Sequence, residues 1–390
     1  MGPLVVYSVT GFSGYALLLP VAPLWAVQGG AGAAGAGLVN GVLLGTTVLA
    51  QFAVPWLLRA AGYARGTTLG LVLLAIGAAL HVVSDALPWI LACAVVRGAG
   101  FGILTVTGSA IVAHLAPPGL RGRMIGVYGL AVAVPNLVLL PAGVPLVDLV
   151  GFTPVLLLAA LPLVGIPAAV RLGHLVETAI ADKAAEDAVE RAASGGAIVS
   201  EPRSSLLAAV GPPTTVLLAA TLAGGALLTF IPQVTSSGVA GLALLLMGVA
   251  AAAARYGAGN LADAGSRAGQ QWLAPFLLLS AAGTALCAWG TYDESRAWLL
   301  LGGVLAGAGY GALQNLTLVS AFHRAGPGRV DQTSTVWNAG FDGGTALGSV
   351  MVGVVASAWG FPTAFAVASI GCVLALAAAR ATTQSPAACA

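Results

Sequence analysis

Charged residues are scarce in this sequence. Only 7% of its 390 residues are Asp, Glu, Lys or Arg, whereas a typical soluble domain carries roughly 25%. So few charges could not cover the surface of a soluble protein of this length, and the mean hydropathy of +0.97 agrees with that conclusion. The sequence therefore predicts that most of the chain lies in a lipid bilayer.

Other shortages exclude further classes of protein. The formal net charge of +2 gives no sign of the strongly basic surface that binds nucleic acids. The sequence holds no HExxH, GxSxG or phosphate-loop motif, so it gives no support for an enzyme or for a bound cofactor. There is no CxxC pair, and most cysteines lie in apolar runs, which indicates packing residues and neither a disulfide nor a metal site. The cysteines are Cys93, Cys287, Cys372 and Cys389.

The apolar runs are long enough for membrane-spanning helices. They extend over about 20 residues each, whereas strands of a membrane barrel are about 10 residues long and alternate in polarity. We expect no cleavable signal peptide, because the N-terminus lacks a basic region and enters the first run almost at once. The predicted spans are 4–27, 35–58, 67–84, 88–115, 123–147, 152–171, 206–231, 237–256, 271–291, 296–322, 332–357 and 360–380.

Basic residues alternate between the predicted loops, and this sets the orientation. Loops that carry Arg or Lys face the cytoplasm in most membrane proteins, which predicts that both termini are cytoplasmic. The cytoplasmic loops would hold Arg59, Arg65, Arg121, Arg123, Arg255, Arg267, Arg324 and Arg329. Lys183 is the only lysine, and the excess of Arg, Ala and Gly suggests a GC-rich genome. We therefore expect the inner membrane of a bacterium.

The chain divides into two similar halves. The fourth predicted span contains GAGFG at 98–102, and the tenth contains GAGYG at 307–311. The offset between these two stretches, 209 positions, also places His114 on His323, Pro118 on Pro327 and Tyr128 on Trp337. We therefore expect bundles of six helices at 1–171 and 206–390, related by an axis along the membrane normal. A polar linker at 172–205 joins them, and the spacing of its charges favours a cytoplasmic helix.

Several short stretches are similar to motifs of the major facilitator superfamily. After the eighth span, GNLADAGSR keeps Gly259, Asp263 and Arg267 of the family's loop signature, whereas the copy after the second span, PWLLRAAGYAR, has Arg59 where the family has Asp. In the fourth span, Arg97 lies one turn after the position of a motif arginine, which Ala94 occupies. The eleventh-span FDGGTALGS resembles a stretch of many bacterial drug and sugar exporters.

This resemblance implies an all-α membrane fold of twelve helices in two bundles, and transport by alternating access without a cofactor. It is closest to exporters of the drug:proton antiporter type, although the fifth-span LLPAGV has Leu140 where those exporters have Gly. We expect a monomer that exports a small apolar or amphipathic molecule, coupled to protons. The alternative is a proton-coupled importer of a polar or anionic metabolite, such as a sugar or an organic acid. A receptor without transport activity also remains open.

Asp342 is the acidic residue that we place at mid-membrane. A charge at that depth costs at least about 2.5–3.5 kcal/mol, so it suggests function. Asp342 shares a helical face with Asn338 and Thr345, whereas Gly340, Gly344 and Gly348 form another face suited to close helix packing. Because desolvation favours the neutral carboxylic acid, Asp342 is our candidate for proton coupling. The alternative is an interhelical hydrogen bond with no other role.

Other polar residues of the spans are candidates for the substrate cavity. Arg97 could bind an anionic group or pair with a carboxylate, or it could be purely structural. The resemblance places the first, fourth, seventh and tenth spans around the cavity, and the tenth carries a polar face. The remaining candidates are Asn338, Thr345, Tyr310, Gln314, Asn315, Tyr15, Gln233 and Asn136.

The loop motifs predict charge pairs that act in gating. In the family, the motif Asp contacts the start of a helix in the other half, so Asp263 would approach Arg121 and Arg123. On the other side, Arg59 replaces the Asp and the eleventh span begins with Asp331. We therefore expect a reversed pair of Arg59 with Asp331. The alternative is that Arg59 only follows the distribution of basic residues.

Overall fold

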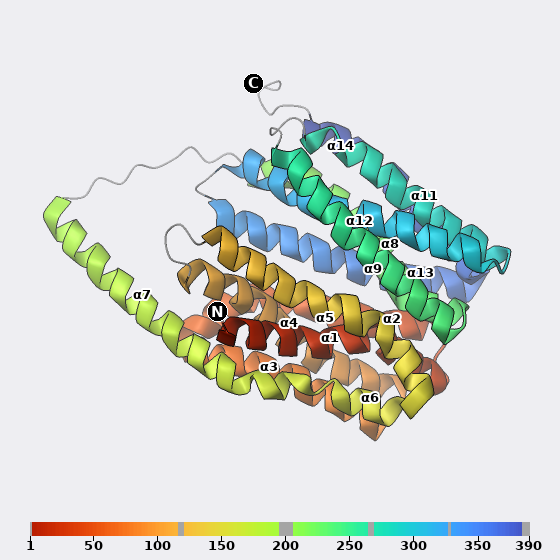
Figure 1. Ribbon diagram of the computed structural model, residues 1–390, viewed down its shortest axis with the longest axis horizontal. Helices are drawn as coiled ribbons and strands as arrows, with labels where there is room; N and C mark the ends of the chain where they lie inside the picture. Colours follow the sequence, from red (N-terminus) through yellow and green to blue (C-terminus); the bar gives the residue numbers. More distant parts are fainter. Residues whose placement is uncertain (1, 116–120, 195–205, 264–268, 327–328, 384–390) are drawn as a thin grey trace.

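The computed structural model describes residues 2–115, 121–194, 206–263, 269–326 and 329–383. At some helix positions within these ranges, including 121–126, 263 and 330–331, only the backbone is described. Helices make up nearly all of the described chain, and they form two bundles that lie side by side (Figure 1). The predicted all-α fold is confirmed.

The first bundle begins with helices whose ends lie close to those predicted. Its elements are α1 (Gly2–Gln28), α2 (Ala33–Ala61), α3 (Tyr63–Ala79), α4 (Leu87–Leu115), α5 (Arg121–Val150), α6 (Phe152–Leu158) and α7 (Ile166–Ser194). The sixth predicted span is broken, because a 3₁₀ turn over Leu161–Gly165, which contains Pro162, separates α6 from α7. Helix α7 then continues without interruption into the predicted linker and extends beyond the body of the molecule (Figure 1).

The second bundle ends in a long helix with a bend. Its elements are α8 (Leu206–Val234), α9 (Ser237–Asp263), α11 (Leu273–Tyr292), α12 (Arg296–Ala325), α13 (Val330–Leu374) and α14 (Leu376–Thr383). The described chain has 11 helical segments that are long and apolar enough to cross a membrane. The last of them, Gln332–Thr383, covers 52 residues and continues from α13 into α14. Gly360 has φ 80° and ψ 164°, a conformation that L side chains rarely adopt, and it divides this helix near the predicted boundary. The arrangement is therefore consistent with twelve crossings.

One boundary error changes the interpretation of a charge. The eighth span was predicted to end at 256, and Arg255, next to that end, was counted with the cytoplasmic loop. Helix α9 in fact runs to Asp263, so Arg255 lies two turns inside it. The prediction was wrong because apolarity ends before the helix does, and a charged side chain that finds a polar neighbour does not terminate a helix.

The two halves pack their helices in the same way. Gly98 of α4 lies against the backbone of Leu43 in α2, and the matching Gly307 of α12 lies against that of Met247 in α9. The other predicted pair also corresponds in space. A Cβ at Gly108 would lie 2.6 Å from the Tyr128 hydroxyl, and at the equivalent positions Trp337 Nε1 donates to Thr317 Oγ1 at 3.1 Å. These shared contacts support the duplication that the sequence suggests.

Helix α13 packs on α8 through its glycine face, as the sequence predicts. Gly340 meets Thr214, Gly344 lies where a Cβ would be 2.6 Å from Leu218 O, and Gly348 meets the backbone of Leu222. Small residues allow such close approach, which drives helix association where lipid removes the hydrophobic effect. The C-terminal bundle is therefore a tightly packed unit that can move as one body.

The bundles are fastened to each other on the side predicted to face outward. Ala34 N of α2 donates to Ser357 Oγ of α13 at 2.9 Å, and Asn40 Nδ2 donates to Thr229 Oγ1 of α8 at 3.0 Å. Between α5 and α9, Ser237 Oγ donates to Asp148. In Figure 1, α5 and α9 lie close together at the right-hand end and diverge toward the left. These contacts hold the two halves together near their predicted outer ends.

We predict that Gly348→Ala destabilises the protein and that Gly343→Ala does not. A methyl at 348 would collide with the Leu222 backbone, whereas a Cβ at 343 has nothing within 4 Å. Overpacking costs about 1–3 kcal/mol, so the Tm of the purified Gly348→Ala protein should fall. Equal Tm values for the two variants would contradict this account of the α13–α8 contact.

Candidate functional site

Asp342 lies where the two halves meet. It is buried, with 5% of its side chain exposed, and it stands within α13, twelve residues after the helix start at Val330. Its Oδ2 accepts a hydrogen bond of 2.7 Å from the amide Nε2 of Gln51, which belongs to α2 of the other bundle. The carboxylate therefore joins the two halves of the chain near mid-membrane.

Gln51 is held in place by its own half. It is 4% exposed, and its Nε2 also donates to Thr105 Oγ1 of α4 at 3.3 Å. Its Oε1 is buried with no hydrogen-bond partner among the described residues. The amide thus presents its donor group to Asp342, which is the arrangement that an ionised carboxylate requires, because such a group only accepts hydrogen bonds.

Two tyrosines border Asp342, one from each half. Tyr15 of α1 stacks on Phe101 of α4 with ring centroids 3.8 Å apart, and Tyr310 of α12 packs over Gly224 of α8. Both hydroxyls are within electrostatic reach of Asp342. These two residues were predicted to line the cavity; both lie within electrostatic reach of the carboxylate, and their part in lining a cavity stays a prediction.

Arg255 belongs to the same region. Its Nη1 donates to Gln314 Oε1 of α12 at 3.0 Å, and Asn315 Nδ2 donates to its backbone oxygen at 3.2 Å. It also interacts electrostatically with Tyr310, which in turn interacts with Asp342. The Arg255 side chain remains exposed. In the C-terminal bundle, a cation and a carboxylate therefore both interact with the same tyrosine.

Arg97 is placed differently. Its side chain is fully buried, at 0% exposed, inside the N-terminal bundle, where its stem passes Gly77 of α3. It interacts electrostatically with Tyr15 and Cys93, and no hydrogen bond joins it to Asp342 in the described structure. Tyr15, which interacts with both charges, is the link between them.

Four predicted cavity residues use their polar groups within their own helices. The Nδ2 groups of Asn338 and Asn136 donate to the backbone oxygens of Ser334 and Val132 at 2.9 and 2.8 Å. Gln233 Nε2 donates to Thr229 O at 3.1 Å, and Thr345 Oγ1 donates to Phe341 O at 2.9 Å. In this conformation they do not contact Asp342 through hydrogen bonds, so their part in substrate binding stays a prediction.

The predicted gating pairs fall largely outside the described part of the chain. Arg59 is exposed at the end of α2. The side chains of Asp331, Asp263, Arg121 and Arg123 lie outside the described residues. Both pairings therefore remain predictions.

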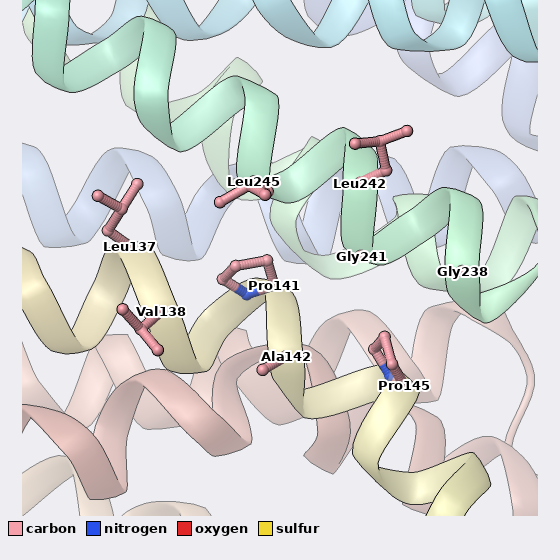
Figure 2. A pocket seen from close by; sticks show the side chains of 9 residues that line it. All are labelled: Leu137, Val138, Pro141, Ala142, Pro145, Gly238, Gly241, Leu242 and Leu245. Atoms are coloured by element: carbon pink, nitrogen blue, oxygen red, sulfur yellow. The ribbon is translucent and has the colours of Figure 1, made fainter.

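An apolar groove between the bundles is distinct from this site. Its volume is about 450 Å³, and it lies between α5 and α9 (Figure 2). None of its lining side chains carries a hydrogen-bonding group, so it offers nothing that would orient a polar solute. The lining residues are Leu137, Val138, Pro141, Ala142, Pro145, Gly238, Gly241, Leu242 and Leu245.

Sequence reasoning missed Gln51 and misplaced Arg255. Gln51 is one of two amides in the apolar run of the second span, with Asn40, and a polar amide at such a position was the available signal. Arg255 could have been found from its place between the apolar run and the motif at Gly259. Both are polar residues within long helices, and each donates a hydrogen bond to a neighbouring helix.

A sequence profile of the Major Facilitator Superfamily matches residues 4–338. The chain belongs to this superfamily. It is accordingly a membrane transporter and not an enzyme, as the sequence analysis expected. No curated protein sequence matches the chain.

Solved structures of other superfamily members share the fold. One is a transporter of the POT family in complex with 5-aminolevulinic acid, with TM-score 0.74 and 14% identity over 98% of this chain and 96% of that one. Another is a bacterial homologue of the human lysosomal transporter Spinster, with TM-score 0.70 and 13% identity over 98% and 97% of the chains. A POT peptide transporter in complex with sulfate has TM-score 0.74 and 16% identity over 97% and 94%.

We predict that Gln51 and Asp342 are energetically coupled in this transporter. Removing either side chain with Ala leaves the other buried without its partner, and a hydrogen bond to a charged group contributes about 1.5–3 kcal/mol. Thermal or denaturant unfolding of Gln51→Ala, Asp342→Ala and the double variant should give a coupling energy of that order. Additive effects of the two substitutions would show that the bond does not form in the membrane.

Proposed function

We propose that this superfamily member is a proton-coupled secondary transporter in which Asp342 carries the proton. The observation that carries the proposal is the hydrogen bond from Gln51 to the buried Asp342, because it places a titratable group at the contact between the two moving halves. A proton-coupled cycle needs such a group, because the charge of the group must influence how the two halves contact each other.

The hydrogen bond supplies a physical link between protonation and movement. Bonds to an ionised acceptor are roughly twice as strong as bonds between neutral groups. Protonation of Asp342 therefore weakens its attachment to Gln51 and lowers the cost of separating α13 from α2. A proton bound from one side of the membrane would in this way favour the conformation that releases it to the other side.

We propose that in this conformation the transporter is open toward the predicted cytoplasmic side. The support comes from the contacts at the opposite end, where Ala34 meets Ser357 and Asp148 meets Ser237. The divergence of α5 and α9 away from that end agrees with this view (Figure 1). In an alternating-access cycle these outer contacts would break when the two bundles rock around the central site.

For the substrate, we favour a small organic anion or zwitterion, which is the polar or anionic alternative of the sequence analysis. The support is Arg255, which stands in α9 and interacts with Gln314 and Tyr310. Arginine binds carboxylates with two parallel hydrogen bonds, and Asp342 could attract an amino group. Two of the similar structures hold acidic ligands, 5-aminolevulinic acid and sulfate, which is consistent with this class.

Export of an amphipathic molecule, our first expectation from the sequence, is the second candidate. Aromatic rings on both sides of the site favour it: Tyr15 and Phe12 both pack on Phe101, and Phe341 lies between Tyr310 and Trp337 with ring centroids 6.0 and 5.8 Å away. Such surfaces bind the apolar body of a solute. The two candidates differ in whether the solute needs Arg255.

We predict that Asp342→Asn abolishes proton-driven transport but preserves exchange of substrate. The amide is close in size and its oxygen still accepts from Gln51, but it cannot change its charge. Proteoliposomes should show counterflow without substrate-linked proton movement. Asp293→Asn, which alters an exposed carboxylate after α11, is the control and should retain coupling. Proton movement at the wild-type level in Asp342→Asn would eliminate the proposed role.

We predict that Arg255→Gln selectively reduces the binding of organic acids. A charged hydrogen bond contributes about 1.5–3 kcal/mol, so the Kd for an acidic solute should rise at least about tenfold. The measurement is a thermal-shift panel of amino acids, small organic acids and neutral amphipathic compounds, with the exposed Arg171→Gln as a control. Stabilisation by neutral amphipathic compounds alone, and equally in both variants, would support the second candidate instead.

A further inference from the structure

Arg97 carries a charge that nothing in the described structure balances. Its Nε, Nη1 and Nη2 atoms are all buried and have no hydrogen-bond partner among the described residues, and its side chain is 0% exposed. A guanidinium does not lose its proton in proteins. A buried charge of this kind is strongly unfavourable unless it is paired and hydrogen-bonded, so this arginine requires a counter-ion.

The groups around Arg97 cannot provide that counter-ion. Tyr15 and Cys93 interact with it electrostatically, and so does His81 at the end of α3. None of these is a carboxylate, and a histidine could add only positive charge.

The acidic residues of the first half, and Asp342 of the second, have other places or partners in the described structure. Before the linker, the sequence contains only Asp85 and Asp148. Asp85 follows the 3₁₀ turn at the predicted outer ends of the helices, and Asp148 accepts from Ser237. Asp342 accepts a hydrogen bond from Gln51 at the interface between the two bundles. Among the described residues, therefore, no carboxylate pairs with Arg97.

The fold itself does not require an arginine here. The position that corresponds to Arg97 in the second half is Ala306, which packs closely on Gly283 of α11. In the first half the facing residue is Gly77, where a Cβ would lie 2.6 Å from Arg97 Cγ. The same helix crossing thus contains a small side chain in one half and a charged side chain in the other. Packing alone therefore does not explain the arginine.

His81, in the 3₁₀ turn over Leu80–Val83 that follows α3, lies close to Arg97. It is 0% exposed, its Nδ1 lies 2.7 Å from Gly77 O, and its Nε2 is buried without a partner among the described residues. Trp25 Nε1 donates to His81 O at 2.9 Å, which fixes the turn that carries the imidazole. Unpaired polar atoms on two neighbouring helices therefore converge inside one bundle.

We propose that Arg97, together with Tyr15 and His81, binds a small inorganic anion inside the N-terminal bundle. The anion supplies the missing negative charge and accepts hydrogen bonds from the guanidinium. The site is separate from the solute site at Asp342 and Arg255, and Tyr15 borders both. Because all of its residues belong to one bundle, the anion would stay bound while the two halves move.

The test is the anion dependence of thermal stability in the purified, full-length protein. Potassium chloride, nitrate and bicarbonate are compared with potassium gluconate at equal ionic strength. A ligand that binds only the folded state raises Tm in proportion to the logarithm of its concentration. We expect at least one of the small anions to raise the Tm of the wild-type protein by several degrees above its value in gluconate.

Two variants distinguish the site from a general salt effect. Arg97→Gln removes the charge and should abolish the difference between the anions, whereas the exposed Arg65→Gln should leave it unchanged. If Arg97→Gln does not fold, Arg97→Lys keeps the charge but loses the planar donor fork, so it should shift the anion response to higher concentrations.

Three results would overturn the proposal. The first is an equal Tm of the wild-type protein in all four salts. The second is an anion response that survives in Arg97→Gln. The third is recovery of the wild-type Tm when Asp342→Asn is added to Arg97→Gln. Such a recovery would mean that Arg97 pairs with Asp342 in another conformation and needs no external anion.

Discussion

A single hydrogen bond between Gln51 and Asp342 connects the two halves of this transporter near mid-membrane. Contacts within each half hold the two partners of this bond in place. Thr105 holds the amide from α4, and the glycine face of α13 fixes the carboxylate by pressing its helix against α8. The bond is formed between two bodies that are each rigid, so a change in its strength becomes a change in the relation between the bodies.

The rigidity of the halves follows from their small residues. Glycines at matching positions, such as Gly98 and Gly307, bring α4 onto α2 and α12 onto α9 until backbones touch. Without a hydrophobic effect between helices in lipid, this contact and the interhelical hydrogen bonds provide much of the cohesion. The contacts between halves are different in kind, because several of them are hydrogen bonds such as that of Ser237 with Asp148. Polar contacts of this type can exchange partners, which suits a surface that must open and close.

The sequence was sufficient for the fold because the bilayer imposes strong rules. Length, apolarity and the placement of arginines define the spans, and repetition of the glycine motifs defines the halves. It was also sufficient to single out Asp342, since an acid in an apolar run is conspicuous. It could not supply the partner, because Gln51 is 291 positions away in the chain and only the packing of the halves brings them together. Arg255 was misplaced for a related reason: the end of an apolar run marks the edge of the hydrocarbon, and the helix continues past it.

Asp342, Arg255 and Arg97 differ in a way that matters for a moving protein. Asp342 has its partner in the opposite bundle, so the free energy of that pair depends on the conformation. Arg255 has its partner, Gln314, in its own bundle and still exposes its guanidinium, so it can bind a solute in addition. Arg97 is enclosed by α1, α3 and α4 of one bundle, and rocking of the halves changes little in its surroundings. A charge whose partner lies across the interface can drive movement, whereas a charge enclosed within one bundle must be neutralised in every conformation. This distinction is the reason that we propose Asp342 as the proton carrier and a bound anion, held within one bundle, as the counter-ion of Arg97.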